Sequence, residues 1–301
     1  MSDPLESLKQ LKYQPQPGRW ERLASQPPKR RSSRPMFIVG GLLAAALVAA
    51  GVFFGRGPSI SLPTEIVSNG ARRLTALTPK WLELGTGESA TVTIADIGTV
   101  TVDEGSRVRL KQTGPTQHRL ELERGTLHAL VTAPPRLFVV DTPTASAIDL
   151  GCAYTLEVTD TGSRLTVTSG LVSLAGKGRE VTVLAGMRAL SAPNRPPTTP
   201  VSLDASAAMV DALDRFDRLA DPTALDAAVL LARTEDAATL WHLLPVAPPA
   251  QRAALIAQLT AFVAPPAGWN DAAAADGSSP LMQTWWAAII AFEPQAAPTK
   301  K

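Results

Sequence analysis

The stretch that decides the fold is residues 140–158, which read VDTPTASAIDLGCAYTLEV. Pro143 cannot donate a backbone hydrogen bond, so it ends one strand and orders a turn. Gly151 then permits a bend that a side chain would block. After the bend every second residue is apolar, and a strand places such residues on one face. The residues of that face are Cys152, Tyr154, Leu156 and Val158. The stretch therefore predicts a turn followed by a strand that buries an aromatic side chain.

The same alternation, with a period of two residues, extends from about Trp81 to Leu190. Apolar and hydroxyl side chains alternate in residues 91–94 and 99–102, which is the pattern of half-buried strands. Glycines separate the runs and several of them open a new strand, among them Gly98, Gly125 and Gly170. We therefore expect about ten to twelve short antiparallel strands joined by tight turns, arranged as a sandwich, a roll or a short β-solenoid.

Residues 149–154 (DLGCAY), preceded by Thr142-Pro143, resemble the core of the FecR-like family. The pattern continues through residues 167–172 (VTSGLV) and 183–186 (VLAG), and the resemblance covers about residues 81–190. It implies a membrane-anchored regulator with a short inner part, one spanning helix and a periplasmic β domain. It also implies an extracytoplasmic-function sigma factor as the cytoplasmic partner.

We interpret the motif residues as determinants of the fold and not as a binding site. Cys152 and Tyr154 stand where the better-known Gly-Thr-x-Phe form of the family has Thr and Phe, and both lie on the predicted buried face. The candidate residues are Thr142, Pro143, Asp149, Leu150, Gly151, Cys152, Tyr154, Gly170 and Gly186.

Residues 36–55 read MFIVGGLLAAALVAAGVFFG and contain no charge. A helix of this length spans about 30 Å, the thickness of a bilayer's hydrocarbon core. Four basic residues precede it between Lys29 and Arg34, which predicts a cytoplasmic N-terminus and a C-terminal portion on the outer side of the membrane. The resemblance to the FecR-like family implies that this is a single-pass protein of the bacterial inner membrane with a periplasmic C-terminus. A cleaved signal peptide fits less well, because 35 residues precede the apolar run. Gly51 and Gly55 form a GxxxG pair that would suit a homodimer.

Residues 1–35 carry eight basic residues against three acidic ones. Leu5, Leu8 and Leu11 form a weak apolar stripe, and Trp20 follows two prolines. These four residues are a candidate docking motif that folds on a cytoplasmic partner, while the alternative is a mostly disordered tail.

The C-terminal third becomes helical in pattern, with about five helices and an excess of acidic residues, eleven against six. Its charge argues against nucleic-acid binding. Helices are expected to begin at Asp221-Pro222, Thr234 and Ser279-Pro280. Leu219 is expected on the apolar face of the helix before Asp221, and Leu230 is expected to face inward on the helix after it. The expected organisation is a cytoplasmic basic tail (1–35), a transmembrane helix (36–55), a linker (56–80), a FecR-like β domain (81–192), a Pro-rich linker (193–205), an α-helical domain (206–293) and a tail (294–301).

No catalytic pattern emerges from the sequence. The three histidines have no neighbours at metal-ligand spacing, and the single Cys excludes an intramolecular disulfide. A triad of His128, Asp149 and a serine lacks the strained nucleophile turn that would support it. We therefore expect no enzyme, no cofactor and no metal.

Two hypotheses of function follow. In the first, the outer β domain senses an envelope state or an envelope protein, and the inner tail relays the state to a sigma factor or a similar regulator. In the second, the chain is a non-catalytic envelope scaffold or binding module, and the tail only sets the topology.

Overall fold

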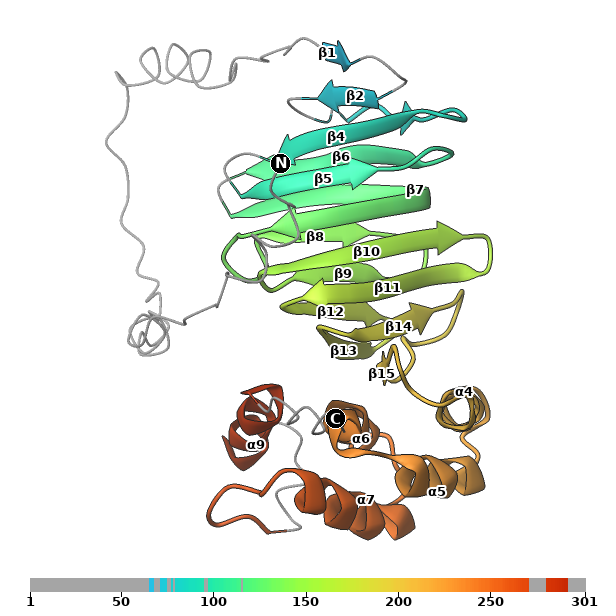
Figure 1. The fold of residues 1–301 in the computed structure, drawn as a ribbon, viewed down its shortest axis with the longest axis vertical. Helices are drawn as coiled ribbons and strands as arrows, with labels where there is room; N and C mark the ends of the chain where they lie inside the picture. The colour runs from blue at the N-terminus through green and yellow to red at the C-terminus, as the bar shows by residue number, and fades with distance from the viewer. Residues whose placement is uncertain are drawn as a thin grey trace, which may run out of the picture. The chain divides into compact units, whose positions relative to one another are not determined.

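The computed structural model describes residues 65–67, 71–74, 77, 79–94, 97–114, 116–270 and 280–291. These residues form a mainly β structure with a smaller helical region after it (Figure 1). The predicted tail (1–35) and transmembrane helix (36–55) lie outside the described residues. Among the residues that are described, no helix combines the length and the apolar character needed to cross a bilayer.

The strands form one sheet with two arms that share strand β7. In spatial order, the first arm contains β1 (Glu65–Val67), β2 (Ala71–Leu74), β4 (Ser89–Ile94), β5 (Gly98–Val102), β7 (Gln117–Val131), β10 (Cys152–Thr159), β11 (Gly162–Ser169), β14 (Met187–Ser191) and β15 (Val201–Ser202). The second arm contains β3 (Leu82–Glu83), β6 (Arg107–Gly114), β7, β8 (Phe138–Asp141), β9 (Ser146–Asp149), β12 (Leu171–Gly176) and β13 (Arg179–Leu184). Because the sheet curls, the inner faces of both arms bury their side chains in one core.

The curl depends on a change of phase inside β7. Buried residues are even-numbered before the bend, at Leu120 and Leu122, and odd-numbered after it, at Leu127 and Val131. The first half of the strand pairs with β6 and β8, and the second half pairs with β5 and β10. Gly125 lies at the change with φ 94°, where the irregular backbone turns the apolar face into the other arm.

The prediction of a mainly β region is confirmed, with twelve strands, β3 to β14, among the described residues between Leu82 and Ser191. The prediction that all strands are short and antiparallel is wrong in two respects. Strand β7 has 15 residues, and the pairs β2/β4 and β7/β8 are parallel. Alternation identifies a strand but carries no information on the direction of its partner, which depends on where the connecting chain crosses.

The helical region contains α4 (Ala207–Leu219), α5 (Pro222–Leu231), the 3-10 helix η1 (Thr234–Asp236), α6 (Ala237–Leu243), α7 (Pro249–Phe262) and α9 (Pro280–Ala291). Helix α5 begins where the Asp-Pro pair predicts, with the Asp221 carboxylate accepting from the Thr223 amide at 2.9 Å. Leu219 and Leu230, expected on inward faces, are 70% and 85% exposed.

Residues 193–205, expected as a Pro-rich linker, contain β15, which pairs with β14. They lie within one compact unit that spans Ser61–Lys301. The division into a β domain (81–192) and a helical domain (206–293) stays a prediction.

Candidate functional site

The motif centres on a buried carboxylate in the turn between β9 and β10. Asp149 is fully buried, and its Oδ2 accepts the Gly151 backbone N–H at 2.9 Å. The thiol of Cys152 donates to Oδ1 of the same carboxylate. The side chain thus folds back over the turn that follows it and accepts hydrogen bonds from two donors of that turn.

Burial dominates the electrostatics of this turn. It raises the pKa of Asp149 to about 6, although the bonds from Cys152 and Gly151 act in the opposite direction. Burial and the neighbouring Asp149 charge raise the pKa of the Cys152 thiol well above its usual range. Cys152 is therefore a protonated, unreactive thiol at neutral pH.

Tyr154 fills the core two residues after Cys152. Its side chain is 2% exposed, and its hydroxyl finds no hydrogen-bond partner within the described part of the chain. Burial raises the pKa of this phenol well above its usual range. The residue occupies the buried face of β10 that the alternation predicts.

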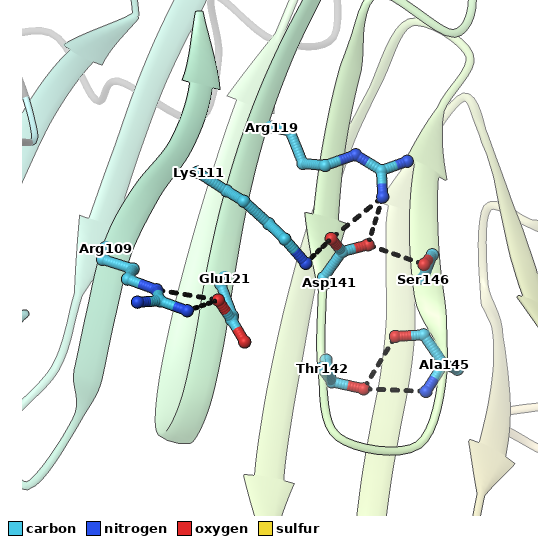
Figure 2. Close-up of polar contacts among 8 residues, drawn as sticks. All are labelled: Arg109, Lys111, Arg119, Glu121, Asp141, Thr142, Ala145 and Ser146. Carbon is cyan, nitrogen blue, oxygen red and sulfur yellow. Dashed lines mark hydrogen bonds and ion pairs between the residues drawn. The ribbon is translucent and has the colours of Figure 1, made fainter. Parts of the chain in front are cut away.

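The Thr142-Pro143 element forms the turn between β8 and β9. The Thr142 hydroxyl donates to the Ala145 carbonyl at 2.9 Å and accepts from the Ala145 amide at 3.0 Å (Figure 2). Ser163 of β11 also donates to Thr142, at 2.8 Å. The Thr144 hydroxyl lies 2.7 Å from that of Ser191 in β14. The turn is thereby tied to the facing arm of the sheet.

Among the remaining motif residues, Leu150 and Gly170 lie beside Gly151 at a corner of the sheet. The Leu150 amide donates to the carbonyl of Leu171, the first residue of β12. A side chain at Gly170 would place its Cβ 2.1 Å from the Gly151 carbonyl oxygen. Gly186 sits in the turn between β13 and β14, with its amide donating to the Val167 carbonyl at 2.9 Å. The structure therefore brings Leu150, Gly151 and Gly170 together and places Gly186 at a separate turn.

The structure contains a second buried acid, Asp141, which was not predicted as a site residue from the sequence (Figure 2). Its side chain is 11% exposed and faces the opposite side of β8 from Phe138 and Val140. Arg119 contacts both carboxylate oxygens at 2.9 Å. Lys111 and Ser146 complete the cluster at 3.1 Å and 2.7 Å.

The Asp141 cluster joins strands that are distant in sequence. Lys111 comes from β6, Arg119 from β7 and Ser146 from β9, while Arg109 and Glu121 form a neighbouring ion pair on the same two strands (Figure 2). In the sequence, the cluster is marked only by alternating charged residues in the segments that form β6 and β7. The same pattern is typical of an ordinary solvent-exposed strand face, so it does not predict a cluster around Asp141.

His128 does not approach Asp149. Its Nε2 lies 2.9 Å from the Asp103 carboxylate, and its Nδ1 lies 2.9 Å from the Thr155 hydroxyl. This trio lies on an exposed face of the sheet, with 46% of the His128 side chain accessible. Within the described ranges, no three His, Cys, Asp or Glu residues gather in a way that could hold a metal ion. The expectation that the chain is not an enzyme stays a prediction.

The candidate docking residues Leu5, Leu8, Leu11 and Trp20, and the helix pair Gly51 and Gly55, lie outside the described residues. The interpretation of the β-domain motif residues as determinants of the fold stays a prediction.

Comparisons with known proteins identify the β region. No curated protein matches the chain. Two crystal structures from Parabacteroides distasonis ATCC 8503, at 1.65 and 2.50 Å resolution and described as "a putative anti-sigma factor", are similar at 18% identity and a TM-score of 0.36. Each match covers 45% of this chain and 65% or 64% of the other, which is less than two thirds of its length.

The family model described as "FecR protein" matches residues 82–173. This range begins at β3 and ends within β12, so it includes the shared strand β7 and the whole Asp149 turn. The resemblance drawn from residues 149–154 is thereby confirmed, since residues 82–173 of this protein match the FecR family model.

Proposed function

We propose that the protein is a membrane-anchored regulator that senses an envelope state through its FecR domain and relays it to a cytoplasmic extracytoplasmic-function sigma factor. The observation that carries this proposal is the FecR match over residues 82–173. The relay would run through residues 36–55, an uncharged stretch of bilayer length between the basic N-terminal residues and the β region.

The proposal assigns sensing to the β region, whose motif side chains are occupied within the fold. The buried polar groups of the motif are engaged in holding turns, as the bonds of Thr142 and Asp149 show. These side chains stabilise the scaffold, so recognition of an envelope partner would use its exposed outer faces.

The cytoplasmic contact is proposed to lie in residues 1–35, through Leu5, Leu8, Leu11 and Trp20. An apolar stripe of this kind can fold against a partner groove, with the free energy of apolar burial offsetting the entropy lost on ordering. The membrane location, with the N-terminus inside, is part of the same proposal.

Site-specific photo-crosslinking tests the contact in the full-length chain. A photoreactive residue at Trp20 should crosslink to a sigma factor in cells, and Leu8→Asp should abolish the crosslink. Glu6→Gln, a change at a neighbouring polar position, is the control and should leave it intact. Crosslinks only to the chain itself, in cells where the sigma factor is expressed, would count against the proposal.

A tail replacement separates relay from scaffolding. Residues 2–28 are replaced by an unrelated sequence, which keeps the basic cluster from Lys29 to Arg34. The relay predicts altered transcription of the sigma factor's genes. Unchanged transcription, with an envelope defect only after loss of the β region, would favour the scaffold instead.

A further inference from the structure

Helix α4 lies beside strands β14 and β15, and a polar anchor holds it there. The Asp217 carboxylate of α4 accepts the Thr199 backbone N–H at 2.6 Å and the Thr199 hydroxyl at 2.9 Å, two residues before β15. The Arg179 guanidinium of β13 contacts the same carboxylate at 3.1 Å. The side chains of Arg179 and Asp217 are only 15% and 8% exposed, so these charged contacts are shielded from water and tie the helix to the sheet.

A groove runs between α4 and these two strands, and it has two connected lobes. The outer lobe has a volume of about 540 Å³, which lies within the range of about 300–1,000 Å³ that is usual for small-molecule sites. The inner lobe has a volume of about 70 Å³. Arg188, Val210 and Asp214 line both lobes, so the two lobes form one continuous space.

On the side of the sheet, the groove contains an unpaired cation. Arg188 lies between Met187 and Ala189 of β14, which are both buried in the core, so its side chain points to the opposite face of the sheet. There it is half-buried, and within the described residues it has no hydrogen-bond or ion-pair partner. A guanidinium that has lost part of its water gains from a carboxylate, which it can bind through two parallel hydrogen bonds.

On the side of the helix, the groove contains an unpaired anion. The residues of α4 that line the outer lobe recur at intervals of three and four, which is the spacing of one helical face: Ala207, Val210, Asp211 and Asp214. Asp214 pairs with Arg218 of the same helix at 3.1 Å. Asp211 has no hydrogen-bond or ion-pair partner in the part of the chain that the structure describes. Apart from the groups that are already paired, the groove therefore presents one free charge of each sign.

The inner lobe is smaller and mainly apolar. Ala189, Val201 and Leu213 line it, and all three are buried. Its volume of about 70 Å³ compares with about 30 Å³ for one water molecule in the liquid, so it has room for a small apolar side chain. Burial of such a side chain would add the free energy of apolar transfer to the binding of a ligand.

We propose that this groove binds a small zwitterion of the amino-acid type. Arg188 donates to its carboxylate, its ammonium group donates to Asp211, and its apolar side chain enters the inner lobe. A zwitterion fits because it supplies one charge of each sign, whereas a simple anion would leave Asp211 unpaired and a simple cation would leave Arg188 unpaired. This proposal goes beyond the proposed function and does not depend on it, since binding can be measured whether or not the chain contacts a sigma factor.

Isothermal titration calorimetry of the full-length chain at pH 7, with L-leucine and with the dipeptide alanyl-leucine, tests the proposal. The dipeptide carries the same two charges further apart, so the tighter binder distinguishes a free amino acid from a peptide as the ligand. At least one of the two compounds should bind with a dissociation constant of about 1 mM or tighter. Weaker binding of both compounds would overturn the proposal.

The roles of the two ligand charges are tested by removing each charge in turn. The amide of the bound compound lacks the carboxylate, and its N-acetyl form lacks the ammonium group. Each should bind at least about 10-fold more weakly, because a charged hydrogen bond is lost and one protein charge stays unpaired. If either neutralised form binds as tightly as the parent compound, recognition of a zwitterion is excluded.

The variants Arg188→Gln and Asp211→Asn identify the protein groups. Each should weaken binding at least about 10-fold. The matched controls are Arg195→Gln and Asp160→Asn, which remove the same charges at exposed positions that line neither lobe, and they should leave the affinity unchanged. Thermal denaturation checks that all four variants are folded. An unchanged affinity in Arg188→Gln or Asp211→Asn, or an equal loss in the controls, would exclude the groove as the binding site.

Discussion

The carboxylate of Asp149 accepts a hydrogen bond from the Cys152 thiol across the turn between β9 and β10, and both side chains are buried. The acid and the thiol of the motif are therefore parts of one local structure. The backbone N–H of Gly151 binds the second carboxylate oxygen, so the bend and its cap depend on each other. Because these groups are buried, we expect specific effects on the stability of the sheet and on the reactivity of the thiol.

The free energy of unfolding of the sheet should depend on pH through the titration of Asp149. Its pKa is raised from 3.8 to about 6, so the charged form is disfavoured in the folded state, and stability should increase as the pH falls from about 6 to 4. The full gain corresponds to about 3 kcal/mol. Urea denaturation followed by circular dichroism, at several pH values, measures it. The neutral variant Asp149→Asn should remove this increase, and an unchanged pH slope in that variant would contradict the assignment.

Cys152 should resist thiol reagents in the folded protein. Burial and the neighbouring Asp149 charge raise its pKa, and the attacking species in alkylation is the thiolate. Labelling with iodoacetamide at pH 8 should therefore be slow in buffer and complete in denaturant, where the same thiol is exposed. Because this is the chain's single cysteine, its mass shift reports one site. Rapid labelling without denaturant would show that the thiol is accessible.

Gly170 and Gly186 form a matched pair of test positions. Both have positive φ angles, 70° and 78°, so alanine at either site costs about 1 kcal/mol in backbone strain. At Gly170 a Cβ would also lie 2.1 Å from the Gly151 carbonyl oxygen, whereas at Gly186 nothing lies within 4 Å. Gly170→Ala should therefore be the more destabilising by at least about 1 kcal/mol. Equal losses in thermal denaturation would mean that the close approach at Gly170 is not rigid.

The contact between Asp141 and Arg119 should be energetically coupled. A double-mutant cycle with Asp141→Asn and Arg119→Gln should give about 1–3 kcal/mol, because the carboxylate is buried and charged hydrogen bonds are strong there. The exposed pair Glu157 and Arg164, 3.4 Å apart, is the control and should give below about 1 kcal/mol. A coupling energy no larger than that of the control would contradict a strong contact and would mean that Lys111 and Ser146 hold the Asp141 carboxylate without Arg119.

Several features of the structure could be predicted from short stretches of the sequence. The alternation after Gly151 places Tyr154 and Leu156 in the core, since successive side chains of a strand point to opposite faces. The Asp221-Pro222 pair marks the start of α5, because a side-chain acceptor and a fixed φ both favour the first turn. The expected inward positions Leu219 and Leu230 were wrong, because at the last turn of a short helix the periodicity is not constrained by further contacts.

By itself, then, the sequence determined the period, the turns and the family of the β region, because each depends on residues a few positions apart. Tertiary structure alone decided how β7 divides between two arms and which cations reach Asp141, 22 and 30 residues away. It also brought Arg179 to the carbonyl of His242, 63 residues later. These pairings arise when the curled sheet closes its core, and no short-range pattern records which exposed charge will meet which partner.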